Sequence, residues 1–129
     1  MEGLASLQMD SAYVSKDYHH DTGSVQVTLD ENGTPSYDIR EGVAWDVLGI
    51  SEKLEALAPT VDAVCFGSLA QRHSVSRATI LAFLGKMSPQ ALKLFDVNLR
   101  QDYFSQSILQ ESLEQATVFK LSDEELPVV

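Results

Sequence analysis

Polar side chains follow three short apolar runs of this 129-residue chain, and their types are those that hold small polar ligands. Gly67 and Ser68 follow the first run, residues 96–100 follow the second, and residues 120–125 follow the third. A phosphate group is held by local amides and by one or two cations whatever the total charge, so nucleotide binding is not excluded. If the three runs lie side by side, the sequence predicts a binding crevice.

The elements around these groups indicate how they are positioned. Residues 61–69, 92–95 and 117–121 are predicted to be strands, and the first run is so nearly continuous that it predicts a strand covered on both faces. Residues 74–87 and 105–116 have the spacing of apolar side chains that is typical of helices. Alternation of strands and helices predicts parallel strands joined by right-handed crossovers, whose carboxyl ends share one edge.

An antiparallel element is predicted before this layer. Residues 24–29 alternate apolar and polar side chains, and residues 37–40 alternate again. Asn32-Gly33 between them is a favoured hairpin turn pair, because both residue types tolerate positive φ. We therefore expect a β-hairpin over residues 21–40 with one apolar face.

Three further helical segments are expected. Residues 42–50 form the first, and residues 51–58 form the second, with Ser51 as N-cap and Pro59 at its end. Ser122 is expected to open the third, near the end of the sequence.

Composition narrows the classes of partner. Nine basic residues against 19 acidic ones give a formal net charge of −10, which argues against nucleic acid and against an anionic membrane surface. The contents of 44% hydrophobic and 22% charged residues are ordinary for a globular domain. No window approaches the roughly 20 apolar residues that cross a bilayer, and the first residues do not resemble a secretion signal, so the cytoplasm is the expected compartment. Small molecules remain as partners.

The single cysteine excludes an intramolecular disulfide and a multi-cysteine metal site. Cys65 lies within an apolar run, which predicts a small buried hydrophobic side chain rather than a reactive thiol. Trp45, among apolar residues, is expected to be a packing anchor.

Several candidate sites have competing structural roles. Asp96 and Asn98 also serve as turn or cap residues, and an Asp/Arg pair at a strand end is often a structural ion pair. Ser122 and Glu125 have the spacing of a capping box, in which each side chain satisfies an amide at a helix start. The two roles are compatible, since a helix start also attracts anions.

Other catalytic patterns have little support. The His19-His20-Asp21 run has no further ligand at a suitable spacing and fits a solvent-facing loop better than a metal site. His73 has no serine or cysteine at a recognisable catalytic spacing. The seven glycines are well separated, so no glycine-rich phosphate loop can be built from them. The chain alone is therefore not expected to be a self-sufficient kinase of a familiar kind.

Five segments together resemble the ribokinase-like (PfkB) carbohydrate kinases, and bacterial fructokinases among them most of all. Residues 21–25 and 33–39 resemble the lid hairpin of that family, and residues 64–72 resemble its fructokinase-type central strand. Residues 95–100 match its Asp-x-Asn-x-Arg segment, and residues 120–126 are similar to its Lys-x-Asn-x-x-Glu-Leu segment. The likeness runs in order over nearly the whole chain.

The resemblance implies an α/β fold, with a parallel Rossmann-like (ribokinase-like) sheet layer and a small β-hairpin lid, incomplete at both ends. Residues 1–129 would be a partial carbohydrate kinase domain, with the lid at 21–40 and a βαβαβ core portion at 60–129. ATP and Mg²⁺ are implied as phosphate donor and metal, and a sugar hydroxyl as acceptor.

Site residues are implied by position in the family's motifs. Those implied for substrate binding are Thr22 and Gly23 at the start of the lid segment, Gly67 and Ser68 on the sugar side, and Asn98 and Arg100 facing the sugar or the transferring phosphate. Glu125 would organise magnesium and phosphate through water.

Two departures from the family pattern limit these roles. Ser122 stands where the family usually has Asn. The family's amino-terminal Gly-Gly-Asn region and its carboxyl-terminal Gly-Ala-Gly-Asp segment, which carries the catalytic Asp base, are not in this sequence. We therefore expect an internal fragment of an ATP-dependent fructokinase-type enzyme, with negligible turnover alone and no catalytic base of its own.

Two alternatives remain open at this stage. The chain could be a non-catalytic sugar- or nucleotide-binding module derived from a kinase. It could also be an interaction element that forms a homodimer through the exposed edge of the lid hairpin.

Overall fold

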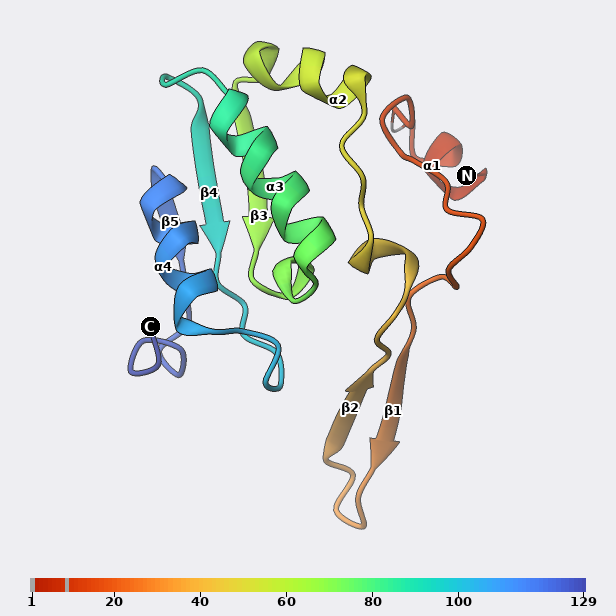
Figure 1. Ribbon diagram of the computed structural model, residues 1–129. Coiled ribbons are helices and arrows are strands. Elements are labelled where there is room, and N and C mark those ends of the chain that lie inside the picture. The colour runs from red at the N-terminus through yellow and green to blue at the C-terminus, as the bar shows by residue number, and fades with distance from the viewer. Residues whose placement is uncertain (1, 9) are drawn as a thin grey trace.

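The computed structural model describes residues 2–8 and 10–129, and it consists of a layer of strands and helices with a hairpin projecting from it (Figure 1). The strands are β1 (Val25–Leu29), β2 (Pro35–Ile39), β3 (Ala63–Gly67), β4 (Leu92–Asp96) and β5 (Val118–Lys120). The α-helices are α1 (Glu2–Ser6), α2 (Glu52–Leu57), α3 (Ser74–Lys86) and α4 (Gln106–Gln115), and short 3₁₀ turns lie at Ala44–Asp46, Ala58–Thr60 and Leu69–Gln71.

A parallel sheet forms the second half of the chain, as the alternation of strands and helices predicts. Its order is β3-β4-β5, with α3 and α4 as the crossovers. The expected α/β class, with a parallel layer and a separate hairpin, is confirmed. Ser105 caps α4 by accepting a hydrogen bond from the Ile108 amide, so this helix begins where the sequence predicts.

The core lies between the sheet and the helices. Phe66 of β3 and Phe95 of β4 are partners in the parallel register, and their rings stack with centroids 5.2 Å apart. Leu84 of α3 and Leu109 of α4 pack in the same buried cluster. Full burial of each such side chain contributes about 1.5–3 kcal/mol, so this cluster stabilises the packing of the helices on the sheet.

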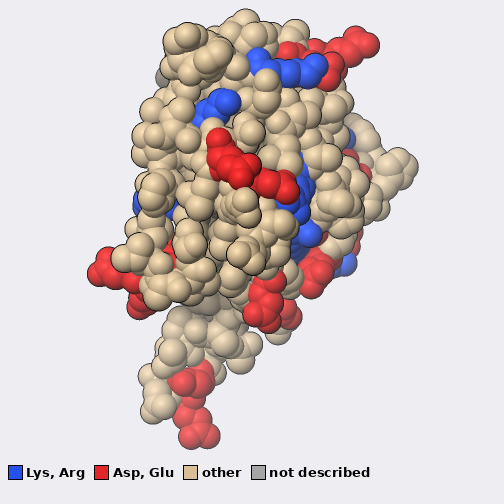
Figure 2. Space-filling view, turned by 60° about the vertical axis from the view of Figure 1, so that its left-hand side comes forward, with Lys and Arg blue, Asp and Glu red and all other residues tan. Residues whose placement is uncertain are grey.

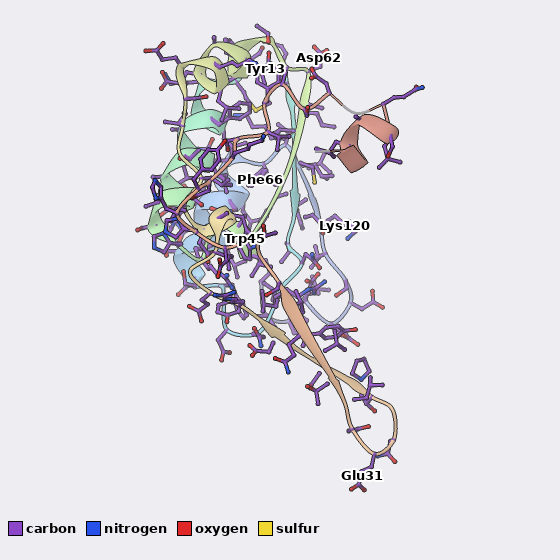
Figure 3. The ribbon with its side chains drawn as sticks, turned by 90° about the vertical axis from the view of Figure 1, so that its right-hand side faces the viewer. Tyr13, Glu31, Trp45, Asp62, Phe66 and Lys120 are labelled. Atoms are coloured by element: carbon purple, nitrogen blue, oxygen red, sulfur yellow. The ribbon has the colours of Figure 1, made fainter. Side chains whose placement is uncertain are left out.

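The opposite face of the sheet is open, and the prediction that β3 is covered on both faces is wrong. Cys65, Leu94 and Val118 share that face by register, and Cys65 and Val118 are exposed. Cys65 is therefore not the buried side chain that its apolar surroundings predict. The reason is topological, because two successive right-handed crossovers in one direction place both helices on the same face. Figure 3 shows the helices of the layer on one side of the strands.

The hairpin forms as expected, but its turn differs from the prediction. Leu29 pairs with Pro35, so the connection spans residues 30–34 rather than Asn32-Gly33 alone. Of that pair only Gly33 has positive φ, at 80°. The Asp30 carboxylate accepts hydrogen bonds from the Asn32 and Thr34 amides, both at 2.8 Å, and this side-chain bonding stabilises the longer loop.

The hairpin also has the expected apolar face. Side chains of paired residues point to the same side, which places Val25, Val27, Leu29 and Tyr37 together with Ile39. Ile39 is buried at the stem, whereas the other four are at least half exposed.

The helix expected over residues 42–50 is a single 3₁₀ turn. Val43 is extended, and its amide donates to the Asp46 carboxylate at 3.2 Å. Leu48 donates its amide to Ser76 Oγ and accepts from Thr79 Oγ1, both on α3. These side-chain partners replace the hydrogen bonds of a helix, so the segment follows α3 in an irregular path.

The two remaining helical expectations have different outcomes. Ser51 caps α2 by accepting from the Leu54 amide, as expected. Residues 123–128 form turns and not the helix that Ser122 was expected to open.

The surface is consistent with the acidic composition. Figure 2 shows the acidic side chains dispersed over one face and at the far end of the hairpin, without a single large patch. Within residues 2–8 and 10–129, no helix combines the length and the apolar character that a membrane span needs.

Candidate functional site

The carboxyl ends of the three parallel strands meet, as the sequence predicts. Gly67 pairs with Asp96, and Asp96 pairs with Lys120. Lys120 Nζ lies 2.9 Å from Asp96 Oδ1, and this hydrogen bond raises the pKa of Lys120 above its ordinary value. The Asp96 carboxylate therefore has a structural ion-pair partner on the neighbouring strand.

Glu125 joins the loops that follow β4 and β5. Its two carboxylate oxygens accept the Leu99 amide at 2.6 Å and the Ser122 amide at 2.8 Å. The Ser122 amide is the main reason that the pKa of Glu125 lies below its ordinary value, and the Leu99 amide adds to the effect. Half of the expected capping box is thus present, and the same carboxylate holds the loop that contains Asn98, which has a φ of 43°.

Gly67 and Ser68 act at the end of β3. Ser68 is 1% exposed, and its hydroxyl donates to the Val97 carbonyl at 2.7 Å. A Cβ on Gly67 would lie 3.1 Å from the Asp96 carbonyl oxygen. Both residues therefore let the ends of β3 and β4 approach closely, and the Ser68 hydroxyl is engaged within the protein.

A cavity of about 890 Å³ lies between the hairpin and the edge of the sheet. The apolar face of the hairpin forms one wall, with Val25 and Ile39 among its lining residues, and Leu69 and Arg100 line it from the sheet side. Gly23 completes the lining at the hairpin stem. The cavity therefore combines apolar surface with one guanidinium group, as sites for small polar ligands often do.

The structure brings together only part of the predicted site. Gly23 and Arg100 line this cavity, and Thr22 lines a neighbouring one of about 670 Å³, with Gly23 and Trp45 common to both. Gly67, Ser68, Asn98 and Glu125 are not among the lining residues of either cavity. They belong instead to the strand ends and loops that position Arg100.

Gly23 is required by its contact with Trp45. A Cβ at position 23 would lie 2.6 Å from Trp45 Cδ1, which no real contact allows. The indole therefore covers the hairpin stem only because residue 23 has no side chain.

A buried ion pair beneath Trp45 is the main feature that sequence reasoning missed. Arg72 Nε and Nη2 donate to the two oxygens of Asp46 at 2.7 and 2.8 Å, and both side chains are at most 5% exposed. The guanidinium lies between the rings of Trp45 and Tyr103, at 4.1 and 4.5 Å from their centroids. The sequence correctly predicts that Trp45 packs against other residues. It does not identify Arg72 as the partner, because residues 46, 72 and 103 follow no regular spacing.

Asp46 is ionised in this setting. Burial alone would raise the pKa of its carboxyl, but the hydrogen bonds from Arg72 and from the Val43 amide outweigh that effect and hold the pKa below its ordinary value.

The histidine run has a local structural partner. The Asp17 carboxylate accepts the His19 and His20 amides and pairs with His20 Nδ1 at 2.9 Å. These hydrogen bonds, that of the His19 amide above all, lower the pKa of Asp17 to about 2. No three potential metal ligands come together in the part of the chain that the structure describes.

Comparisons with known proteins are consistent with this geometry. No family model matches the sequence. The chain is 29% identical over 132 residues to the putative sugar kinase PH1459 of Pyrococcus horikoshii, an alignment that covers 98% of this chain and 42% of that protein. The crystal structure of PH1459 superposes with a TM-score of 0.81 at 28% identity, covering 98% of this chain and 43% of the other.

Two fructokinase structures are also similar. The fructokinase of Xylella fastidiosa with bound ATP gives a TM-score of 0.83 at 20% identity, over 98% of this chain and 41% of the other. That of Vibrio cholerae O395 gives 0.73 at 25% identity, over 98% and 45%. The expected resemblance to sugar kinases is confirmed, and the fold is that of these enzymes over less than half of their length.

We predict that Gly23→Ala displaces Trp45 and loosens the hairpin stem. The added methyl group clashes with the indole, and relieving such overpacking costs about 1–3 kcal/mol of unfolding free energy. The chain has a single tryptophan, so a change in its emission reports the displacement directly.

The matched control is Gly85→Ala, because a Cβ there meets nothing within 4 Å. This change in α3 should leave the emission as it is and keep or raise stability. Equal emission spectra for Gly23→Ala and the parent protein would contradict the clash.

We predict that Glu125→Gln lowers stability at neutral pH by on the order of 1 kcal/mol, because amides bind a carboxylate more strongly than a neutral amide oxygen. The folded-state pKa of Glu125 is lowered, so its contribution is complete above the ordinary value of 4.5 and is lost as pH falls through the lowered pKa. Urea unfolding of both proteins at pH 7 and near pH 3 should therefore show a difference that shrinks on acidification.

The control for this prediction is Glu124→Gln, which removes an equal charge from an exposed neighbouring position. If it has the same effect as Glu125→Gln, or if the Glu125→Gln difference is constant with pH, the two amide contacts do not act as described.

Proposed function

We propose that residues 1–129 are a partial carbohydrate kinase domain of the ribokinase-like (PfkB) family, and that they contribute the lid hairpin and central strands to an ATP-dependent sugar kinase of the fructokinase type. The observation that carries this proposal is the cavity of about 890 Å³ between the apolar hairpin face and Arg100 at the sheet edge. The similarity to PH1459 over 98% of the chain supports it. The chain spans about 42% of that relative, so the activity is proposed for a whole kinase.

Arg100 is the residue proposed to contact the substrate most directly. Its side chain lines the cavity, and the terminal nitrogen Nη1 donates to the Leu99 carbonyl at 2.9 Å, which restrains the guanidinium. Asn98, in the left-handed conformation two residues earlier, is proposed to face the sugar or the transferring phosphate beside it. A planar guanidinium is suited to hydroxyl and phosphoryl oxygens.

The other predicted residues are proposed to shape the site. Thr22 and Gly23 form the hairpin stem, where Trp45 covers them, and the apolar face above is proposed to close over a sugar. Gly67 and Ser68 hold the ends of β3 and β4 together, so their proposed contribution to the sugar side is through the shape of the strand edge.

ATP and Mg²⁺ are proposed as phosphate donor and metal. The Xylella fastidiosa fructokinase and PH1459 have both been crystallised with ATP. Each Glu125 oxygen accepts one backbone amide and keeps the capacity for a second hydrogen bond, which fits a contact with Mg²⁺ and phosphate through water. When bound, the metal would neutralise developing charge on the phosphoryl oxygens.

In the proposed reaction the γ-phosphoryl group passes from ATP to a hydroxyl of fructose or a similar sugar. The sugar oxygen forms the new bond to phosphorus, the bond to the ADP oxygen breaks, and the hydroxyl proton is transferred to a base. None of Asp96, Asp123 or Glu125 is proposed as that base. A role with ATP and a sugar is consistent with the cytoplasm as the proposed compartment.

The proposal predicts saturable binding of fructose to the protein, reported by the emission of Trp45, which lines the cavity. Arg100→Ala should weaken this binding by about 10-fold or more, the loss expected for one charged hydrogen-bonding partner. Arg77→Ala is the matched control, because Arg77 pairs with Glu111 between α3 and α4. The isolated chain should release no ADP above background with any hexose.

Two results would overturn this function. The first is that neither fructose and other ketoses nor ribose binds saturably, which would mean that the cavity is not a sugar site. The second is that Arg100→Ala and Arg77→Ala weaken binding equally, which would mean that Arg100 does not contact the sugar. The intact mass of the native product in its source cell separates the two candidate functions. A native product near 14.2 kDa that binds sugar without turnover would be the non-catalytic binding module, whereas a much heavier product would be the complete kinase to which residues 1–129 contribute.

We also propose that a second copy of the chain pairs through the lid hairpin. β1 has one edge that no described strand covers. Leu29 at the end of β1 is 64% exposed and does not line the cavity of about 890 Å³. Pairing this edge with a symmetry-related hairpin would satisfy its backbone groups and remove Leu29 from water, while the rest of the apolar face stays over the cavity.

Sedimentation velocity over a range of concentrations tests the pairing. Leu29→Lys should shift the protein to monomer, whereas Thr28→Lys adds the same charge to the opposite, polar face of β1 and should leave the dimer intact. A parent protein that is monomeric at all concentrations would exclude the hairpin as a dimer interface.

A further inference from the structure

The hairpin is attached to the α/β layer without any strand pairing. β1 and β2 form their own two-stranded sheet, separate from β3-β4-β5. Figure 3 shows the hairpin extending away from the layer, with Trp45 near its stem and Glu31 at its tip. The position of the hairpin over the cavity therefore depends on side-chain contacts at the stem.

Arg72 makes the most extensive of these contacts. It lies between the 3₁₀ turn after β3 and the start of α3, and so belongs to the layer. Its Nη2 donates to the Arg40 carbonyl at 2.6 Å and to the Asp46 carboxylate at 2.8 Å, and both of these residues belong to the segment that follows β2. One guanidinium thus binds the stem at two points.

Two aromatic rings fix the plane of this guanidinium. Trp45 belongs to the hairpin stem, and Tyr103 belongs to the loop between β4 and α4. The ion pair with Asp46 sets the position of the group within the plane, and the rings prevent it from leaving the plane. A lysine ammonium at this site would keep the charge but would lose the paired hydrogen bonds and the flat stacking surface.

The loop between β4 and α4 supports the same edge of the hairpin. Gln101 Nε2 donates to the Tyr37 carbonyl at 2.9 Å, and Tyr103 donates its hydroxyl to the Ile39 carbonyl at 3.2 Å. Together with the hydrogen bond from Arg72 to the Arg40 carbonyl, side chains of the layer thus donate to three carbonyls, two within β2 and one directly after it. Arg100 belongs to the same loop, which connects β4 to α4, so the hairpin and the proposed sugar contact share one support.

From this geometry we propose that Arg72 is the positioning residue of the lid, which holds the apolar hairpin face at a fixed distance from Arg100. The expected effect of Arg72 on sugar affinity rests on the proposed function, whereas its expected effect on the stability of the hairpin does not. Arg72 does not line the cavity and acts on it through the hairpin stem. Loss of Arg72 therefore loosens the lid without removing a sugar contact.

The test uses Arg72→Lys, with Arg77→Lys as the matched control. Arg77 is a partly exposed arginine of α3 whose guanidinium binds Glu111 and Ser107 of α4, and it makes no hydrogen bond to the hairpin among the described residues. Amide hydrogen exchange is measured across the whole chain. In Arg72→Lys we expect exchange at the Arg40 amide and along β1 and β2 to rise by about 10-fold or more, with β3 and β4 changed by less than about two-fold.

A second variant keeps the test informative if Arg72→Lys fails to fold. Tyr103→Phe keeps the ring over Arg72 but removes the hydroxyl bonds to the Ile39 carbonyl and to Glu41. It should raise exchange in the hairpin by a smaller factor, about 3-fold, in the same pattern. Fructose affinity is then measured by Trp45 emission, and it should fall in the order of hairpin exchange.

The two proposals fail in different ways. If the parent protein binds no sugar while Arg72→Lys loosens the hairpin selectively, the proposed function fails and the positioning role stands. If exchange rises equally in both sheets, if it is unchanged in the hairpin, or if Arg77→Lys gives the same pattern, Arg72 is an ordinary structural residue and the inference is overturned.

Discussion

A buried arginine held between two aromatic rings links the two parts of this protein. Removing a charged pair from water costs several kcal/mol per ion, and Arg72 and Asp46 recover that cost only because two guanidinium nitrogens, Nε and Nη2, donate to the two carboxylate oxygens. Arg72 Nη1 has no partner among the described residues, so the compensation is incomplete. A hydrophobic pair of similar volume would pack there without this penalty. The charged pair is instead suited to fixing an orientation, because its hydrogen bonds are directional.

Polar side chains at the strand ends also fix the orientation of neighbouring segments through directional hydrogen bonds, with fewer contacts than Arg72 makes. Glu125 accepts hydrogen bonds from amides of two loops. The Ser68 hydroxyl donates to the carbonyl of Val97, the residue that follows β4. Each contact joins backbone groups that parallel strands leave unpaired at their carboxyl ends. Polar residues that sequence motifs associate with ligand binding thus act here on the protein's own backbone. Arg100 can be positioned at the cavity because its neighbours are already held in this way.

How much of this structure could be predicted depends on the range of the interactions. The parallel layer and the helix that begins after Ser105 follow from local periodicity and from capping, which act within a few residues. The segment 42–50 was wrongly expected to be helical because its hydrogen-bond partners, Ser76 and Thr79, lie about 30 residues away. The exposure of Cys65 depends on what covers the second face of the sheet, which no local pattern encodes. The cluster of residues 46, 72 and 103 is non-local throughout, so only the structure reveals it.

The open face of the sheet also affects the thermodynamics of unfolding. The change in heat capacity on unfolding arises mainly from apolar surface that becomes hydrated, and averages about 12–15 cal/mol/K per residue. In this chain Cys65, Val118 and the apolar hairpin side chains are already hydrated in the native state. These side chains therefore add little to the heat-capacity change when the chain unfolds. The stability curve of the monomer should be flatter with temperature than its length implies, and its stability should depend less steeply on denaturant concentration.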